Sequence, residues 1–330
     1  MKYFETQTER KDLPLVVVPV VFDAMYDDLV KASSLLKDVA RVRIYDDFVT
    51  DRDAVAQRFE GAQAAVNMGI HFDDELLSRI SGSVKCLVFG GTGVASYVDL
   101  ARARDFGIEV RNIVHYGDAS VAEHTLALML DVARQVSTMD RSMKAGEWNT
   151  LECIDLHGKT LGVVGFGGIG KAVSAMAAAF GMRVRVWARP AHQDEIESQG
   201  YEFCDTLEEI FAGSDVVSLH VGFNESTTAM ITSQHLQLLS PGSFFINTAR
   251  AELIEPGALE SRLARGDIRA GIDVYDQEPL PAASPLRAMS NVVLTPHAAW
   301  FSDAASENIA QFTFEDVRAY LRGDDLNLVN

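Results

Sequence analysis

The chain has 330 residues, of which 48% are hydrophobic and 23% charged, so its composition is that of a folded protein and not of a disordered one. Twenty-nine basic and 47 acidic residues give a formal net charge of -18, which argues against nucleic acid or an anionic membrane as a general partner. At about 100–200 residues per domain, the length predicts two domains.

The cysteines, histidines and N-terminal segment indicate the cellular setting. Cys86, Cys153 and Cys204 are far apart and outside any CxxC spacing, which is typical of reduced thiols in a cytosolic protein. The histidines show no metal-ligand spacing, so we predict no metal site. The N-terminal residues are polar, and the first apolar stretch is short and interrupted by prolines. We therefore expect a cytoplasmic protein without a secretory signal or a membrane span.

Short β-branched runs alternate with amphipathic segments along most of the chain. This rhythm is typical of βαβ units, in which helices cover both faces of a parallel sheet. In the first third, the predicted strands are Leu15–Phe22, Arg41–Tyr45, Ala64–Met68, Lys85–Phe89 and Ile108–Arg111. The fourth of these strands leads into a glycine-rich turn, Phe89–Gly93.

The segment Ala119–Thr138 is apolar around much of its circumference and predicts a helix buried on most sides, between domains or across a subunit interface. A second βα series follows, and a final helix is predicted over Asp303–Leu321. The predicted strands of this series are Leu161–Phe166, Arg183–Trp187, Val216–Val221, Ser243–Thr248, Ala270–Val274 and Val292–Thr295.

Residues 165–170 read Gly-Phe-Gly-Gly-Ile-Gly and follow a predicted strand directly. Gly165 suits a tight turn, Gly167 allows a pyrophosphate close to the backbone, and Gly170 allows close packing of strand and helix. The N-terminus of the helix that follows then faces the anion. Lys171 also completes part of a nucleotide-triphosphatase loop, but Ala172 stands where a magnesium-binding hydroxyl is needed, so we reject that alternative. The pattern predicts a dinucleotide site.

The end of the next strand bears on the choice of dinucleotide. An NAD site usually places a carboxylate there for the ribose 2′-hydroxyl, whereas this chain has Ala188 followed by Arg189. An arginine can pair bidentately with a 2′-phosphate, which favours NADP. NAD remains the alternative, with Arg189 as a solvated side chain.

Three later strand ends carry reactive side chains. Arg250 ends the run FFINTAR, Glu278 lies in DVYDQEP, and His297 lies in TPHAAW. Consecutive parallel strands bring their carboxyl ends to one edge of a sheet, where such folds bind ligands. An arginine, a glutamate and a histidine there suit the reduction of a carbonyl next to a carboxylate. Asp276 is interpreted as solvated and His124, in an apolar helix, as a core histidine with satisfied hydrogen bonds.

Together, VAEH at 121–124, GFGGIG, INTAR, DVYDQEP and TPHAAW resemble the D-isomer-specific 2-hydroxyacid dehydrogenase family in order and spacing, over about residues 60–321. The resemblance implies two doubly wound parallel-sheet α/β domains, with a Rossmann nucleotide-binding domain at 113–296 inserted in a flavodoxin-like substrate domain at 1–112 and 297–330. It also implies a homodimer with Ala119–Thr138 at its contact.

The resemblance further implies roles for individual residues. His297 would protonate the carbonyl oxygen as hydride arrives, Glu278 would hold the other ring nitrogen and raise the pKa of His297, and Arg250 would clamp the substrate carboxylate. Backbone N–H groups of Gly91, Thr92 and Gly93 would bind the same carboxylate. Asp273 would receive the nicotinamide amide, and the remaining cofactor-binding residues would be Gly165, Gly167, Gly168, Ile169, Gly170, Arg189 and Thr248.

Two further departures from the family pattern stand out. Ala251 replaces the glycine that commonly follows the catalytic arginine, and the segment after Gly93 is about one residue longer, so Tyr97 could enter the pocket. Trp300 could narrow it. The sequence predicts an NAD(P)-dependent oxidoreductase of a small 2-keto or 2-hydroxy acid, of the glyoxylate or hydroxypyruvate type. The alternative is a dinucleotide-sensing binding module, because TPHAAWFSDAAS also resembles the C-terminal-binding-protein corepressors.

Overall fold

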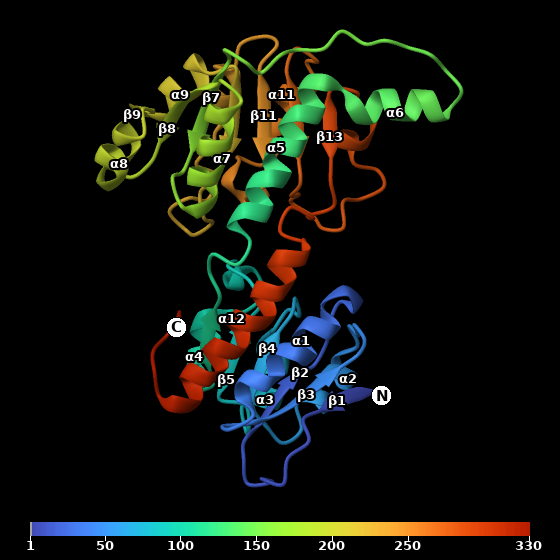
Figure 1. The fold of residues 1–330 in the computed structure, drawn as a ribbon, viewed down its shortest axis with the longest axis vertical. Helices are drawn as coiled ribbons and strands as arrows, with labels where there is room; N and C mark the ends of the chain where they lie inside the picture. Colours follow the sequence, from blue (N-terminus) through green and yellow to red (C-terminus); the bar gives the residue numbers. More distant parts are fainter. Residues whose placement is uncertain (1) are drawn as a thin grey trace. The chain divides into compact units, whose positions relative to one another are not determined.

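The structure, a computed structural model, describes residues 2–330, which form two compact units (Figure 1). One unit contains the chain up to Gly117 together with Ser302–Asn330, and the other contains Asp118–Phe301. The second unit is therefore inserted in the sequence of the first. The divisions follow Gly117 and Phe301, whereas the sequence prediction put them after Asn112 and Pro296, so His297 belongs to the inserted unit.

The first unit is built on one sheet with the strand order β1-β3-β2-β4-β5-β6. β1 pairs antiparallel with β3, and the pairs that follow are parallel. Without β1 this is the strand order of flavodoxin-like folds. The strands are β1 (Tyr3–Glu5), β2 (Leu15–Val18), β3 (Arg41–Tyr45), β4 (Ala62–Asn67), β5 (Cys86–Phe89) and β6 (Glu109–Asn112). The helices are α1 (Tyr26–Ala32), α2 (Arg52–Arg58), α3 (Asp74–Ile80), α4 (Leu100–Asp105) and α12 (Asp303–Arg322).

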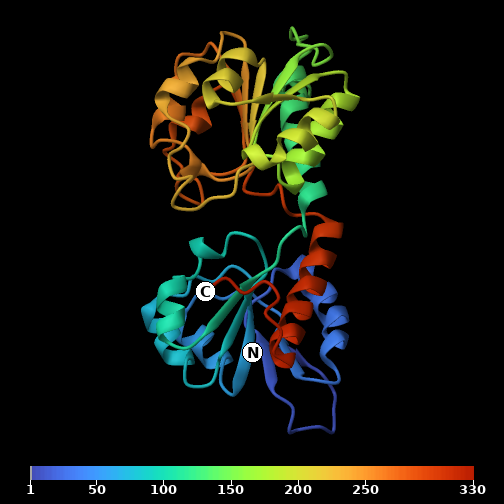
Figure 2. The same ribbon diagram turned by 90° about the vertical axis from the view of Figure 1, so that its left-hand side faces the viewer.

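The second unit has a parallel sheet in the order β13-β12-β11-β10-β7-β8-β9. Figure 2 shows helices on both faces of these strands, as in a Rossmann-type fold. The strands are β7 (Thr160–Val164), β8 (Arg183–Trp187), β9 (Glu202–Cys204), β10 (Val216–Leu219), β11 (Phe244–Asn247), β12 (Arg269–Ile272) and β13 (Val292–Leu294). The helices are α5 (Asp118–Arg134), α6 (Val136–Lys144), α7 (Gly168–Ala179), α8 (Gln193–Ser198), α9 (Leu207–Gly213), α10 (Ser233–Gln237) and α11 (Ala258–Leu263).

Burial explains why the β-branched runs mark the strands. Parallel strands covered on both faces have no solvent side, so they read as continuous apolar runs and not as alternating ones. β7, β10 and β11 are buried along their whole length. In the first unit α12 packs beside α1 against the sheet, so the C-terminal helix completes a domain that the N-terminal residues begin (Figures 1 and 2).

The long helix predicted over 119–138 is interrupted, which corrects the sequence prediction. Gln135 has a left-handed backbone (φ 53°) and separates α5 from α6. Two side chains hold the break: Gln135 Nε2 donates to the carbonyl of Glu152, and the N–H of Ser137 donates to Asp131 Oδ1. The short strands β1 and β9 were not among the strands predicted from the sequence.

Candidate active site

The glycine loop joins β7 to α7 at the point where the strand order reverses between β10 and β7. Gly165 has a φ of 103°, and a Cβ there would lie 2.6 Å from the carbonyl oxygen of His220. A Cβ on Gly170 would collide with the carbonyl oxygen of Gly165. Both positions therefore require glycine for backbone packing alone.

Gly167 differs, because a Cβ there would meet nothing within 4 Å. Among the described residues, the Lys171 N–H donates to the carbonyl of Gly167, and the N–H groups of residues 167–170 have no acceptor. The N–H groups of Gly167, Gly168, Ile169 and Gly170 are thus available to a ligand at the N-terminus of α7. Open space with unpaired N–H groups fits the pyrophosphate of a dinucleotide.

Arg189 is the second residue after β8 and is exposed. Its guanidinium has no hydrogen bond or ion pair within the part of the chain that the structure describes. The neighbouring cation, Lys171, is already paired with Glu195 at 2.5 Å. Ala188 is buried and supplies no acceptor for a ribose hydroxyl. Alanine thus occupies the position where an NAD site usually has a carboxylate, and the unpaired guanidinium is that of the next residue.

The end of β11 positions Arg250. Asn247, the last residue of this strand, is buried, accepts the N–H of Ala249 and donates to the carbonyl of Arg250. The Arg250 guanidinium donates from Nη1 to the carbonyl of Ala249 (2.7 Å), its single hydrogen bond among the described residues. Ala251 lies in a 3₁₀ turn without a positive φ, so alanine replaces glycine there without backbone strain.

His297 and Glu278 form a pair, with His297 Nδ1 at 2.6 Å from Glu278 Oε2. The other glutamate oxygen accepts the N–H of Tyr275 at 3.0 Å. Because an ionised carboxylate only accepts, Nδ1 carries a proton and Nε2 is the nitrogen left for a substrate. Nε2 has no partner within residues 2–330, and the His297 side chain is 29% exposed.

The pKa of Glu278 reflects this surrounding. Burial raises it, but the hydrogen bond and charge of His297, the N–H of Tyr275 and the charge of Arg250 outweigh burial and lower it overall. The charge of Arg250 therefore reaches the pair. Tyr275 in turn donates its hydroxyl to the carbonyls of Ile272 and Thr295, and burial, followed by the charges of Asp273 and Glu278, raises its pKa to about 12. Its phenol stays protonated and connects the ends of β12 and β13.

Asp273, the residue after β12, is completely buried. Its carboxylate accepts the hydroxyl of Thr295 (2.6 Å) and the N–H groups of Ala298 and Ala299 (both 2.9 Å). It thus holds the loop that carries His297. Thr248 is also buried, with its hydroxyl 2.8 Å from that of Thr125 on α5.

The turn at 89–93 belongs to the first unit and follows β5. The N–H groups of Gly91, Thr92 and Gly93 have no acceptor among the residues that the structure describes. Asn112 Nδ2 donates to the Thr92 carbonyl, which fixes the turn from behind. A Cβ on Gly91 would lie 2.9 Å from the ring of Phe89. Three adjacent free N–H groups form a receptor for an anion such as a carboxylate.

The aromatic residues singled out in the sequence have the following neighbours. The Tyr97 ring stacks against His71 (ring centroids 4.7 Å apart) and contacts Phe89 at 4.9 Å. Trp300 contacts Phe301 at 5.0 Å. His124 is half-buried, not enclosed in apolar core, and its Nε2 lies 3.0 Å from Thr295 Oγ1. The interpretation of His124 as a satisfied core histidine is therefore right about a hydrogen-bond partner and wrong about burial in the core.

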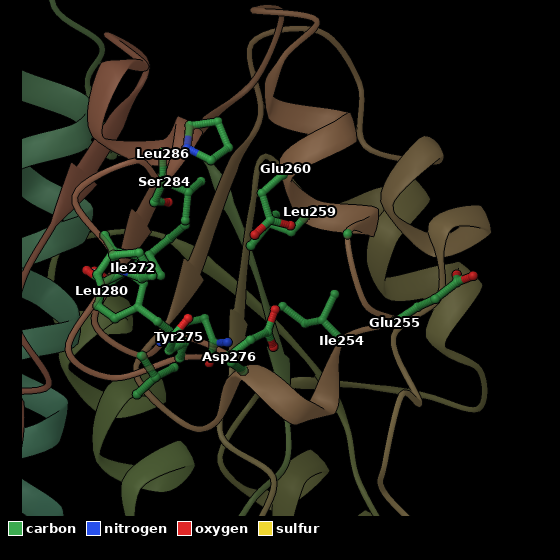
Figure 3. A pocket seen from close by; sticks show the side chains of 17 residues that line it. Ile254, Glu255, Leu259, Glu260, Ile272, Tyr275, Asp276, Leu280, Ser284 and Leu286 are labelled. Carbon is green, nitrogen blue, oxygen red and sulfur yellow. The ribbon is translucent and has the colours of Figure 1, made fainter.

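A cavity of about 260 Å³ lies beside β11 and β12 in the second unit. Figure 3 shows Tyr275 and Asp276 at one end, apolar side chains such as Ile254, and Glu260 pointing inward. Arg250, Glu278 and His297 do not line it. This cavity is separate from the reactive side chains, although Tyr275 borders it and also holds Glu278.

Residues 2–330 contain neither a candidate metal cluster nor a candidate membrane-spanning helix. No cluster of three or more His, Cys, Asp or Glu side chains there is arranged to hold a metal ion. None of the described helices combines the length and apolar character needed to cross a membrane.

Sequence reasoning did not single out Asn247, Tyr275 and Thr295, which position the predicted residues. An asparagine at the end of an otherwise apolar strand could have drawn attention to Asn247, because a buried amide needs partners. Tyr275 and Thr295 lie inside the recognised motifs, but their contacts cross from one strand end to the next.

Comparisons with known proteins agree with this geometry. Residues 126–299 match the family model described as D-isomer specific 2-hydroxyacid dehydrogenase, NAD binding domain. The chain is 34% identical to a glyoxylate reductase of Korarchaeum cryptofilum, over 78% of this chain and 82% of that protein. It is 31% identical to a D-3-phosphoglycerate dehydrogenase of Methanocaldococcus jannaschii, over 92% of this chain, and spans 57% of that protein's length.

A solved structure of an acyclic imino acid reductase (Bsp5) in complex with NADPH and D-Arg resembles this chain with a TM-score of 0.80. It is 26% identical in sequence, and the match covers 96% of this chain and 100% of that one. The similarity therefore extends over both units and not only over the residues of the family model.

Proposed function

The chain belongs to the D-isomer specific 2-hydroxyacid dehydrogenase family, and from this premise we propose that it reduces glyoxylate, hydroxypyruvate or a close relative with NADPH. The observation that carries the proposal is the His297–Glu278 pair together with the Arg250 guanidinium, whose charge acts on Glu278 and which has a single hydrogen bond, to the Ala249 carbonyl. Relatives named glyoxylate reductase and hydroxypyruvate reductase support this substrate class.

Arg250 binds the carboxylate of the 2-keto acid in this proposal. In a chain of net charge -18, an anionic substrate needs a local cation, and the guanidinium retains free donors for a bidentate contact. In the first unit, the free N–H groups of Gly91, Thr92 and Gly93 are proposed as a further receptor for a substrate carboxylate. These contacts fix the orientation of the neighbouring carbonyl and polarise it.

His297 supplies the proton. Glu278 accepts from Nδ1, so the imidazolium presents its Nε2–H to the carbonyl oxygen. When bound, the reduced dinucleotide supplies the hydride to the carbonyl carbon. The oxygen takes the proton from Nε2 as the C=O double bond becomes a single bond, and the imidazole is left neutral. In the reverse reaction neutral Nε2 accepts the hydroxyl proton.

Cofactor binding is assigned to the glycine loop, Arg189 and Thr248. The space at Gly167 and the free N–H groups of Gly167–Gly170 fit a pyrophosphate, and unpaired Arg189 fits a 2′-phosphate, so we propose NADP with NAD as the alternative. The NADPH complex of the imino acid reductase supports this choice. The resemblance assigns the nicotinamide amide to Asp273, but this carboxylate is completely buried and accepts from Thr295, Ala298 and Ala299, so we propose that it acts by holding the loop of His297.

We also propose a homodimer formed through α6 and the residues that follow. None of the α6 side chains is buried, although Val136 and Met143 are apolar, and Trp148 is 85% exposed. Exposed apolar side chains of this size on a projecting helix mark a contact surface. A cytoplasmic location stays a prediction, supported by three free cysteines, of which Cys86 and Cys204 are buried.

Steady-state turnover of glyoxylate and hydroxypyruvate, each with NADPH and with NADH, tests the function. We expect turnover of at least one acid, with a higher kcat/KM for NADPH. A panel of small 2-keto acids that gives no turnover, together with tight dinucleotide binding, would instead favour the corepressor-type binding module. No observation in the fold or the site favours that alternative.

A further inference from the structure

His124 begins a chain of polar contacts that ends at the loop of His297. Its Nε2 lies 3.0 Å from Thr295 Oγ1 and 3.6 Å from Asp273 Oδ1. Thr295 Oγ1 lies 2.6 Å from the same Asp273 oxygen. These residues come from α5, from the end of β13 and from the end of β12, and α5 packs across all three neighbouring strands β11, β12 and β13.

Hydrogen counting gives this chain a direction. The buried Asp273 carboxylate only accepts, so the single hydroxyl hydrogen of Thr295 is directed to it. Thr295 Oγ1 can then only accept from His124, and Nε2 of His124 must carry a hydrogen. The order of donation is therefore His124 to Thr295 to Asp273.

Asp273 transmits this arrangement to His297. Its side chain accepts the N–H groups of Ala298 and Ala299, and its carbonyl oxygen accepts the N–H of His297 at 2.8 Å. His297 has a φ of 52°, a left-handed conformation that a residue with a Cβ adopts only when its surroundings hold it. The fully buried carboxylate is the centre of those surroundings.

We propose that His124 is a positioning residue for the reaction, acting through Thr295 and Asp273 on the orientation of the His297 ring. This inference rests on the proposed role of His297 as proton donor. A carboxylate without exposure depends on each of its donors for its position. Because the contacts of His124 are with Thr295 and Asp273 and not with the Arg250 guanidinium, it affects kcat and leaves substrate KM nearly unchanged.

The test compares His124→Leu, which removes the donor, with His124→Gln, whose Nε2 amide can still donate. We expect kcat to fall about 10- to 100-fold in the leucine variant, with KM for the 2-keto acid within about twofold of wild type. The glutamine variant should recover kcat to within about threefold. His157→Leu is the matched control, because His157 is exposed before β7, at the opposite edge of the sheet; it should keep the wild-type rate.

Thr295→Val provides a second route to the same contact and carries the test if His124→Leu does not fold. Its kcat should fall as in His124→Leu. The double variant, His124→Leu with Thr295→Val, should be no slower than the slower single variant, since both substitutions interrupt the same chain of hydrogen bonds. A wild-type kcat in His124→Leu, absence of rescue by glutamine, or additive effects in the double variant would overturn the inference. The variant His297→Ala, measured alongside, distinguishes failure of the inference about His124 from failure of the proposed function. A wild-type rate in His297→Ala would indicate that the proposed function is wrong.

Discussion

The backbone N–H of His297 donates to the carbonyl oxygen of Asp273 at 2.8 Å, so the residue after β12 directly supports the proposed proton donor after β13. Glu278 holds the ring of the same histidine from the segment between these strands. Backbone and side chain of His297 are therefore held by one stretch of chain, 273–278. This double support explains how a histidine with positive φ is kept in one orientation.

Replacing Arg189 by alanine should weaken NADPH and leave NADH nearly unaffected. A charge-assisted hydrogen bond is worth about 1.5–3 kcal/mol, so we expect KM for NADPH to rise about 10- to 100-fold. KM for NADH should stay within about twofold. Arg265→Ala is a control, because Arg265 is exposed at the opposite edge of the sheet, before β12. Equal effects of Arg189→Ala on both cofactors would show that Arg189 does not bind the phosphate.

Replacing Arg250 by glutamine should impair both binding and chemistry, because this side chain is proposed to hold the carboxylate and polarise the carbonyl. We expect kcat/KM for the 2-keto acid to fall about 10²- to 10³-fold. The kcat/KM of Arg250→Lys should lie between those of wild type and Arg250→Gln, since an ammonium keeps the charge and loses the bidentate geometry. NADPH affinity, measured by fluorescence titration, serves as the control. An unchanged substrate KM in the glutamine variant would remove Arg250 from the carboxylate site.

Asp316 gives the first unit a predictable pH dependence. Burial raises its pKa to about 6 from the ordinary 3.8, although Asn327 donates to both carboxylate oxygens. The folded state therefore binds this proton more tightly than the unfolded state. The stability contribution is largest at pH below the unfolded value, and it decreases as the pH rises through the interval up to about 6.

The variant Asp316→Asn isolates this contribution. Between about pH 4 and pH 7, wild type should lose up to about 3 kcal/mol of unfolding free energy relative to the variant, the equivalent of the difference in pKa. Urea unfolding of both proteins at the two pH values measures it. The same difference in unfolding free energy at both pH values would contradict the prediction.

Two glutamates on α6 should disrupt the proposed dimer. Val136 and Met143 are 59% and 51% exposed, and burying two carboxylates in an interface without partners is unfavourable. Val136→Glu combined with Met143→Glu should therefore give a monomer in light scattering, where we expect wild type to give a dimer. Leu238→Glu, at an exposed apolar residue that ends α10, outside the proposed contact, should leave the dimer intact. A dimeric double variant would place the contact elsewhere.

The sequence predicted the parts of the fold that depend on local patterns. The predicted strands Arg41–Tyr45 and Arg183–Trp187 have the bounds of β3 and β8, because each alternates arginine with an apolar residue and the Val and Ile positions are buried. β1 was missed because it is a short edge strand. Beside its backbone pairing with β3, the Glu5 carboxylate forms ion pairs with Arg41 and Arg43. The break at Gln135 was missed because its cause, the carbonyl of Glu152, lies 17 residues away.

The residues of the candidate site were likewise predicted where they lie in local sequence motifs and missed where they depend on contacts distant in sequence. Motif order identified His297 and Glu278, and their side chains are in contact. The partners of His124 could not be predicted, since Thr295 is 171 residues distant in sequence and the apolar helix suggested only burial. Gly91–Gly93 lie in a turn with free N–H groups, and their anion-binding role stays a prediction.

The most direct test of the account is the kcat of His297→Ala for 2-keto acid reduction with NADPH. Loss of the proton donor should lower kcat about 10²- to 10⁴-fold, while NADPH affinity stays at the wild-type value. A kcat equal to that of wild type would contradict the central claim that this imidazole protonates the substrate.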